Sequence, residues 1–568
     1  MLGQLIPPSW NRFIFQFRVL YRVFLLRVID LEVLSSDGDP SRLMGQFASV
    51  FATLSFFCTF PVPFLIVGRR PIPVPAAYMF EHFFIETTMS IAGLMAVLSW
   101  DSAFPDRRDM LVLGPLPMRS STLFFSKIAA LFAAPALAIL SFNLFTGFGW
   151  PLVFAVGVGS QFSLLRTLPA YWFTVFAAGA FLVFTVLALQ GLAANLLPRQ
   201  IFLRLSAILQ AAALCLLLSA YFLGPSFNSP AALAAPQNQR TLQWLPAYWF
   251  LGLFNQLNGS MRPELAPLAH HAWIALALSA LGALTALLLS YFRMLPRIVE
   301  QPDILPSART RSFGLGFSLG TSLAGVITLF SLRTLLRSRQ HRMILSFYVG
   351  IGLTIILGFI DTKFVQAGAL HPGLNTTFLL ASVLTVSLTV LALRVVIAIP
   401  ITLRANWIFR VTQVRQAHRY HRAVRVSLLL IGVAPALLAL STALFQGDPP
   451  PQIAGHLITM ALLGILIVEL CLLTFQKISF ACSYLPGKAN LHFVFWAALF
   501  ASIYWLKQAA DFEGRMLANP RSFALMVAVL AVAAILLHVV TSLRARQSTQ
   551  LIFEEDLLPE IVSLKLNQ

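Results

Sequence analysis

The sequence predicts an all-α, polytopic integral membrane protein with about 12 transmembrane helices in two six-helix halves. Of its 568 residues, 58% are hydrophobic and 11% charged, and the mean hydropathy is +0.80. Soluble domains carry about a quarter charged residues, so this composition excludes a soluble globular protein. The apolar runs are long and continuous, whereas a membrane β-barrel would show short alternating strands.

Twelve runs approach the roughly 20 residues that a helix needs to cross a bilayer core about 30 Å thick. The first six are Gln46 to Gly68, Tyr78 to Trp100, Leu123 to Thr146, Trp172 to Leu196, Leu205 to Leu223 and Ala272 to Tyr291. The second six are Met343 to Ile360, Thr377 to Ile399, Val424 to Leu444, Ile453 to Phe475, Leu491 to Leu506 and Phe523 to Leu543. The run from Leu491 to Leu506 is the weakest of them.

A polar segment separates the two halves. Residues Leu295 to Ser312 carry three prolines, mixed charge and no apolar period, which indicates a cytosolic linker. We therefore expect a first six-span half with an N-terminal interfacial helix at residues 1–294 and a linker at 295–317. A second six-span half with its own interfacial helix occupies 318–543, and a cytosolic tail occupies 544–568.

The distribution of Lys and Arg predicts the orientation. With the N-terminus in the cytoplasm, the cytosolic segments hold nearly all basic residues, including the connection from Arg293 to Arg342 and the loop from Arg404 to Arg425. Both termini are therefore predicted to be cytoplasmic, in a multi-pass protein of the inner (plasma) membrane. The net charge of +19 follows from this orientation, so we expect no nucleic-acid partner.

Each half is predicted to begin with a basic helix in the inner membrane interface, because apolar residues recur there at helical spacing. The first stripe is Phe13, Phe17, Leu20 and Phe24, and the second is Leu329, Leu332 and Leu336. Basic pairs four residues apart accompany them, Arg18 with Arg22 and Arg333 with Arg337.

A charged cytosolic segment lies between the second and third spans of each half, Trp100 to Lys127 in the first and Ile401 to Arg425 in the second. Composition alone leaves two alternatives, a solvated loop and a docking surface. Aromatic residues among the charges, Phe104 in the first and Trp407 with Phe409 in the second, favour docking.

The order of basic helix, two spans, charged cytosolic helix, then four spans with an outer helix before the last resembles the type-two ABC exporter permease, here as two fused copies. Asp106 to Asp109 followed by LVLGPLPMRSSTLFFSK is similar to the family's charged residues, leucines, Leu-Pro pair and downstream Lys. The second half lacks the Leu-Pro step at Ala405 to Arg410, so position alone assigns it. The resemblance implies ATPase-coupling residues Asp101, Phe104, Asp106, Arg107, Arg108, Asp109, Leu116, Pro117 and Lys127 in the first segment, and Arg404, Trp407, Phe409, Arg410 and Arg415 in the second.

The sequence contains no GxxxxGK[ST] phosphate-binding loop. The nearest pair, Gly487 and Lys488, lacks the upstream glycine and the following Ser or Thr. The resemblance therefore implies separate cytosolic ABC ATPase subunits as partners, besides the lipid bilayer. The chain itself is expected to bind no cofactor and to be no enzyme, with ATP supplied through the partner.

Charged residues within the predicted spans are candidate functional residues, because a carboxylate in hydrocarbon is costly. Glu81, His82 and Glu86 lie in the outer part of the second span, and Glu469 lies toward the inner end of the tenth. As alternatives, Glu81 and His82 reach the headgroups and Glu86 caps a buried hydrogen-bond network. Histidine pairs and cysteines elsewhere lack the spacing of a metal site, so none is predicted.

The string LPAYWF occurs twice, at Leu168 to Phe173 and at Leu245 to Phe250, each beside a predicted span on the outer side. Aromatic anchoring at the membrane interface and contact with substrate are the two interpretations. The segment Trp244 to Leu257 is predicted to form a short helix at the outer surface or dipping into it.

These observations favour the permease of an ABC exporter and leave its substrate open. An ion-coupled secondary transporter, with Glu86 or Glu469 carrying the proton, is the alternative. A membrane-embedded lipid-modifying enzyme is a further alternative, which would need acidic or histidine clusters at the membrane face.

The predicted orientation is tested by reporter fusions at Ser307 and Gln568. Both fusions should report a cytoplasmic location, because the basic loops cluster on that side. Activity of a periplasmic reporter at either position would contradict the six-plus-six arrangement.

Overall fold

The computed structural model describes 8–29, 40–67, 74–100, 113, 116, 119–157, 164–223, 229–260, 263–290, 323–338, 341–350, 352, 376–399, 417–444, 450–473, 479–480 and 508–547. These residues are almost entirely helical, and they include no strand. The chain divides into two compact units, Met1–Ser307 and Ala308–Gln568. The division falls inside the segment that the sequence assigns to a linker.

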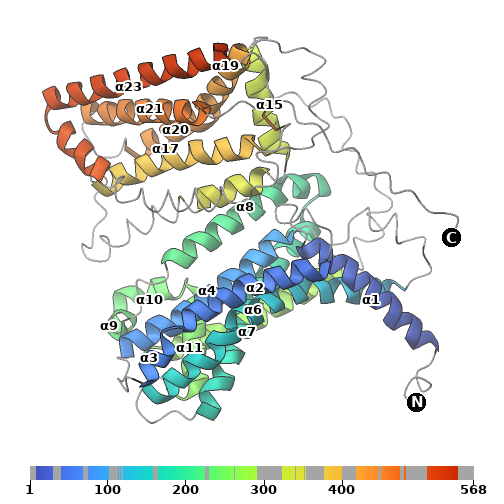
Figure 1. Ribbon diagram of the computed structural model, residues 1–568. Coiled ribbons are helices and arrows are strands. Elements are labelled where there is room, and N and C mark those ends of the chain that lie inside the picture. Colours follow the sequence, from blue (N-terminus) through green and yellow to red (C-terminus); the bar gives the residue numbers. More distant parts are fainter. Residues whose placement is uncertain are drawn as a thin grey trace. The chain divides into compact units, whose positions relative to one another are not determined.

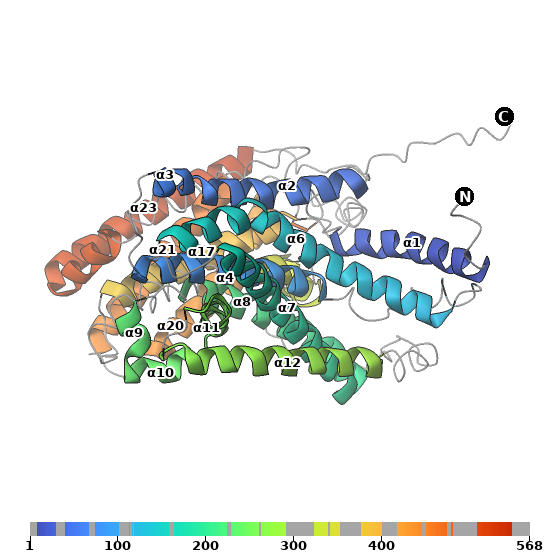
Figure 2. The same ribbon diagram turned by 90° about the horizontal axis from the view of Figure 1, so that it is seen from below.

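Unit 1 is a bundle of long helices with short helices at one end. Its elements are α1 (Pro8–Ile29), α2 (Pro40–Thr59), α3 (Val62–Val67), α4 (Val74–Leu98), α6 (Ser120–Gly157), α7 (Leu164–Leu196), α8 (Arg199–Leu223), α9 (Pro230–Ala234), α10 (Pro236–Leu242), α11 (Pro246–Asn258) and α12 (Ala266–Leu289). Within the unit, α9 to α11 lie at one end and α1 at the opposite end (Figures 1 and 2). The longest helix, α6, has 38 residues and contains Pro135 and Pro151.

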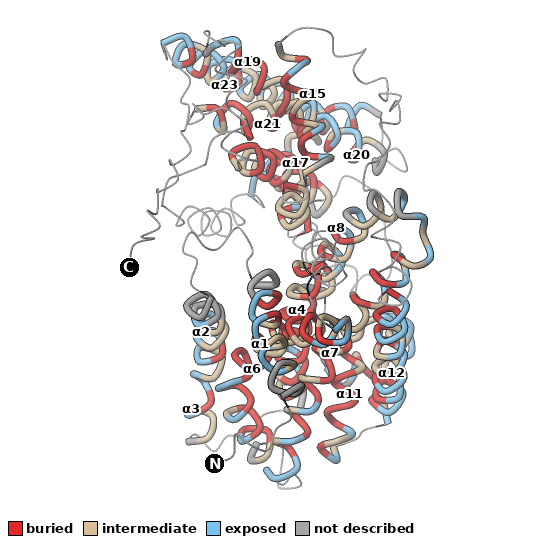
Figure 3. Tube along the Cα trace, turned by 90° about the vertical axis from the view of Figure 1, so that its right-hand side faces the viewer, coloured by how far each residue is buried: buried red, intermediate tan, exposed pale blue. Residues whose placement is uncertain are grey.

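The helix α11 is enclosed by its neighbours. It packs against α4, α7 and α12, and the side chains of Tyr248, Phe250, Leu251 and Leu253 are completely buried. Burial in unit 1 concentrates on α4, α7 and α11, whereas α12 exposes much of its surface (Figure 3). The helix predicted at Trp244 to Leu257 is therefore present, and it inserts into the bundle.

Local chemistry determines where α11 begins and ends. Pro246 occupies its first turn, where a missing backbone N–H costs nothing. Gly259 follows its last residue with φ +83°, a left-handed conformation that glycine adopts without strain. The Nε of Arg166 donates to the carbonyl of Leu257 at 2.9 Å, which places a cation at the negative end of the helix dipole.

Side chains from neighbouring helices satisfy the carbonyl end of α4. The last carbonyls of a helix have no partner within it, and no water is available in a bilayer core. Gln190 of α7 donates to the carbonyl of Trp100, and Gln210 of α8 donates to that of Val97 at 2.7 Å. The indole of Trp100 donates to Ser206 at 2.8 Å. These contacts hold α7 and α8 against the same end of α4.

Unit 2 consists of α15 (Leu323–Arg337), α17 (Thr376–Ile397), α19 (Ala417–Leu428), the π-helical turn η6 (Leu429–Val433), α20 (Ala434–Leu444), α21 (Pro450–Leu473) and α23 (Pro520–Gln547). Residues 341–350 and 508–517 are also helical. The elements α19, η6 and α20 follow one another without a break, so they form one helix with a widened turn.

Both predicted basic helices pack against a long helix of their own unit. Leu20 and Phe24 of α1 are buried against Ala130 and Ala134 of α6, which agrees with the predicted stripe.

In α15 the face packed against the protein is not the leucine stripe. Leu336 is exposed, and the face toward α19 carries Ile327 and Leu335 instead, with Thr328 bonded to Ser427 at 3.0 Å. Small hydroxyl side chains let two helices approach closely and form hydrogen bonds between them. They therefore occupy the contact face in place of leucine.

Eight helices in the described part of the chain are long and apolar enough to cross a membrane. They are Ala48–Ile66, Ser121–Ala155, Leu164–Leu196, Ala266–Leu289, Phe378–Ile397, His418–Ser441, Pro451–Leu473 and Pro520–Gln547. The helix α4 is not among them, because Glu81, His82 and Glu86 interrupt its apolar sequence. The predicted run from Leu491 to Leu506 lies outside the described residues. The all-α membrane architecture is thus confirmed, whereas 12 spans remain a prediction.

The contact between α11 and α12 depends on Gly252. A Cβ atom there would lie 2.7 Å from the backbone nitrogen of Ala269 and 2.9 Å from the carbonyl oxygen of Leu265. Backbone atoms cannot rotate away, so we expect Gly252→Ala to destabilise the protein by about 1–3 kcal/mol. Thermal unfolding of purified protein measures this.

The matched control is Gly45→Ala in α2, where an added Cβ meets nothing within 4 Å. It should be neutral or stabilising by up to about 1 kcal/mol. Equal stability of the two variants would show that α11 is not packed as described.

Candidate functional site in two buried polar clusters

The first cluster lies on α4. Glu81, His82 and Glu86 are almost completely buried, with exposed fractions of 6%, 1% and 7%. Neither Glu81 nor His82 reaches solvent, so the interpretation that these two side chains extend to the headgroups is wrong. The structure places all three in the interior of unit 1, where both a functional role and a buried hydrogen-bond network at Glu86 remain open interpretations.

Glu81 is bonded to α11. The amide nitrogen of Asn255 donates to a carboxylate oxygen of Glu81 at 3.1 Å. The hydroxyl of Ser260 donates to the amide oxygen of the same asparagine at 2.7 Å, which fixes the orientation of that amide. Glu81 thus holds the last turn of α11 against α4.

His82 also contacts α11. Its ring lies 4.1 Å from the ring of Tyr248, measured between centroids. Its Nδ1 is 3.3 Å from a carboxylate oxygen of Glu86, and its Nε2 is buried without a hydrogen-bond partner among the described residues. A buried ring nitrogen without a partner is costly, so a functional role is one explanation for it.

The two copies of LPAYWF converge on this cluster. The first lies within α7, where Tyr171 is buried and lines a narrow void together with Glu81 and Phe254. The second begins α11 and contributes Tyr248, which stacks on His82. The void does not admit a water molecule. Both tyrosines therefore pack inside the unit, whereas an interfacial anchor would place them at its surface.

Charge is unbalanced in the first cluster. Within the part of unit 1 that the structure describes, no Lys or Arg contacts Glu81 or Glu86. The nearby Arg166 is engaged by the carbonyl of Leu257. His82 is the one described basic group beside these two carboxyl groups.

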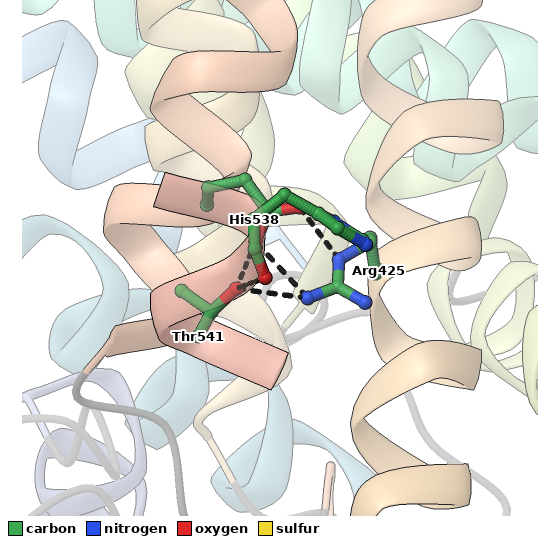
Figure 4. Close-up of polar contacts among 4 residues, drawn as sticks. Arg425, His538 and Thr541 are labelled. Carbon is green, nitrogen blue, oxygen red and sulfur yellow. Dashed lines mark hydrogen bonds and ion pairs between the residues drawn. The ribbon is translucent and has the colours of Figure 1, made fainter. Parts of the chain in front are cut away.

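The second cluster lies in unit 2 and is charge-balanced. Glu469 of α21 is 1% exposed, and its oxygens lie 2.7 Å from Nε of Arg425 and 2.8 Å from Nδ1 of His538. The hydroxyl of Thr541 donates to Glu469 at 2.6 Å and accepts from Arg425 at 3.0 Å. Figure 4 shows Arg425 on one helix approaching His538 and Thr541 on another. The cluster joins α19, α21 and α23.

Sequence reasoning identified Glu469 but missed its partners. His538 and Thr541 lie three residues apart in α23, which places them on one helix face. A polar pair at this spacing in an apolar helix is a signal that could have found them. Arg425 lies in α19, where the predicted cytosolic segment Ile401 to Arg425 and the predicted span Val424 to Leu444 overlap.

Sequence reasoning also missed a buried pair, His456 of α21 and Glu513 of the helical residues 508–517. Their side chains are 2.8 Å apart and almost fully buried. In both units, therefore, a buried polar contact ties a short helix that precedes the last long helix to a long helix of the bundle.

Most of the predicted coupling residues lie outside the described residues. This applies to Asp101, Phe104, Asp106, Arg107, Arg108, Asp109 and Pro117, and to Arg404, Trp407, Phe409, Arg410 and Arg415. Leu116 is exposed. Lys127 is buried in α6, with its Nζ 5.4 Å from the ring centre of Phe24 in α1. This cation–π contact fastens α1 to the first turns of α6.

No group of three or more His, Cys, Asp or Glu residues that could hold a metal ion occurs among the described residues. Comparisons of the chain with models of known protein families, with curated proteins and with solved structures found no match. The site must therefore be interpreted from its own chemistry.

The pairing of Glu469 with Arg425 predicts how variants of these two residues change the stability of the protein. Glu469→Gln leaves the mostly buried Arg425 without its counter-ion, and breaking a buried pair costs about 3–5 kcal/mol. Replacing both partners, as in Arg425→Met with Glu469→Met, should recover most of this loss, because no unpaired charge remains. Thermal unfolding in detergent measures all three proteins.

The control is Arg422→Gln, one turn earlier on α19, where the side chain is exposed. Its effect should stay within about 0.5 kcal/mol. A double variant that is as unstable as Glu469→Gln would show that packing, and not charge pairing, determines the effect.

Proposed function

We propose that this chain is the membrane-spanning permease of an ABC exporter, powered by separate cytosolic ATPase subunits. The observation that carries the proposal is the repeated plan of the two units. Each has a basic helix packed on a long helix, α1 on α6 and α15 on α19. Each also has a short helix before its last long helix, tied to the bundle by a buried polar contact.

In this proposal, the ATPases act on the two charged segments between the second and third spans of each half. The segment before α6 leads into a helix that Lys127 fastens to α1. The segment before α19 leads into a helix that Arg425 fastens to α21 and α23. A displacement of either segment would therefore move several helices together, as transport by rocking of helical units requires.

The charge-unbalanced first cluster favours a second candidate, an ion-coupled secondary transporter. Glu81 and Glu86 are buried carboxyl groups of the kind that carry protons in such transporters. Transport in vesicles separates the two candidates. The exporter requires nucleotide and an ATPase partner, whereas the ion-coupled transporter runs on a proton gradient without nucleotide.

Reversing Arg107 and Arg108 to Glu tests the exporter proposal. Opposed charges at an interface discriminate partners, so the reversal should reduce transport-coupled ATP hydrolysis by about tenfold or more. Cysteine crosslinking from position 106 or 108 to the copurified ATPase measures docking directly. The matched control is reversal of Arg240 and Arg262, which lie on the predicted outer side and should have little effect.

Two results together would contradict the proposal: the absence of any crosslink, and unchanged coupling in the reversed protein. The segment would then be a solvated loop.

A further inference from the structure

We propose that Glu81, His82 and Glu86 form a proton-binding site, and that bound protons hold α11 closed against α4. The inference deepens the proposed function, and it depends on that function only for the statement that α11 faces the outside. The site would make the closure of this helix sensitive to pH at the end of unit 1 where α11 lies.

The first argument is charge. An ionised carboxylate buried in a membrane protein costs several kcal/mol unless a counter-charge accompanies it. Glu469 receives that charge from Arg425, but no described Lys or Arg contacts Glu81 or Glu86. His82 can neutralise one carboxylate at most. Protons must supply the remaining charge while the cluster is buried as the structure shows.

The other titratable and charged groups on the surrounding helices of unit 1 do not supply it. They are Tyr248 on α11, Tyr171 and Arg166 on α7, Tyr221 on α8, Cys58 on α2 and His271 on α12. The hydroxyl of Tyr221 bonds to Thr87, which is next to Glu86, and the ring of His271 stacks on Trp249. The tyrosine and cysteine side chains are uncharged when they hold their protons. The guanidinium of Arg166 lies at the carbonyl of Leu257.

The second argument is space. The void lined by Glu81, Tyr171 and Phe254 does not admit a water molecule. A hydrated metal ion or an organic ammonium group is larger than a water molecule, so neither fits this closed arrangement. A proton needs no such space, because it binds directly to a carboxylate oxygen or a ring nitrogen.

The third argument connects the site to α11. Asn255, which bonds to Glu81, lies in the last turn of α11, where the helix dipole places partial negative charge. An ionised Glu81 would be repelled there, whereas a neutral carboxyl group is not. His82 contacts Tyr248 two turns earlier on the same helix. Loss of the proton from Glu81 would therefore place negative charge against the last turn of α11.

The test measures how readily a buried position on α11 reacts. Leu251, on the α11 face that carries Tyr248 and Asn255, is completely buried. The Leu251→Cys reporter is made in the full chain with Cys58, Cys215, Cys471 and Cys482 replaced, and maleimide labelling is followed from about pH 6 to about pH 9. An exposed Gln256→Cys reporter on the same helix corrects for the reactivity of the thiol. The corrected rate at position 251 should rise about tenfold or more with pH as α11 opens.

Three variants make the result decisive. Glu81→Gln keeps a hydrogen-bond acceptor for Asn255 without a titrating group, so its labelling should stay low at every pH. Glu86→Gln should also make the rise of the corrected labelling rate with pH smaller than in the reporter protein without this change. Glu513→Gln removes a buried carboxyl group of unit 2 and should leave the response of α11 unchanged.

A corrected rate that does not depend on pH would overturn the proposal, as would a pH response that persists in Glu81→Gln. The purified chain is labelled without an ATPase, so either result leaves the exporter proposal standing. Conversely, failure of the ATPase crosslinks would leave the proton site intact.

Discussion

The absence of water in a bilayer core is the constraint on which the rest of the structure depends. A buried polar group there can find a partner only within the chain. Gln190 and Gln210 reach the last carbonyls of α4, and Arg425 reaches Glu469. Each contact links two elements that are distant in sequence, so satisfying polar groups also determines which helices are neighbours.

The sequence predicts the architecture well where long apolar runs and basic stripes carry the signal. The all-α membrane fold follows from composition, and the burial of Leu20 and Phe24 against α6 follows from helical spacing. The leucine stripe of α15 does not show which face packs against the protein, because Leu336 is exposed while Ile327 and Leu335 are buried. In a membrane, leucine faces lipid as readily as protein, so an apolar stripe does not determine the packing face.

The candidate site could be predicted only in part. Glu81, His82, Glu86 and Glu469 stand out in the sequence because they are charged within apolar helices. Their partners do not, since Asn255, Thr541 and His538 are far away in the chain and their residue types are common. Tertiary packing alone shows that Glu469 has a counter-ion and that no described one accompanies Glu81.

The length of α6 has a consequence for how this helix sits in a membrane. At 1.5 Å per residue, its 38 residues extend about 57 Å. Even a steep tilt of about 40° would leave about 44 Å along the membrane normal, which equals the whole bilayer with its headgroup layers. The helix is therefore long enough to reach both interfaces, and Pro135 and Pro151 interrupt its backbone hydrogen bonds along the way. Lys127 contacts α1 near the first residues of α6, and the hydroxyl of Ser55 accepts from the backbone of Thr146 farther along, so α1 and α2 are attached to α6 at separate points along its length.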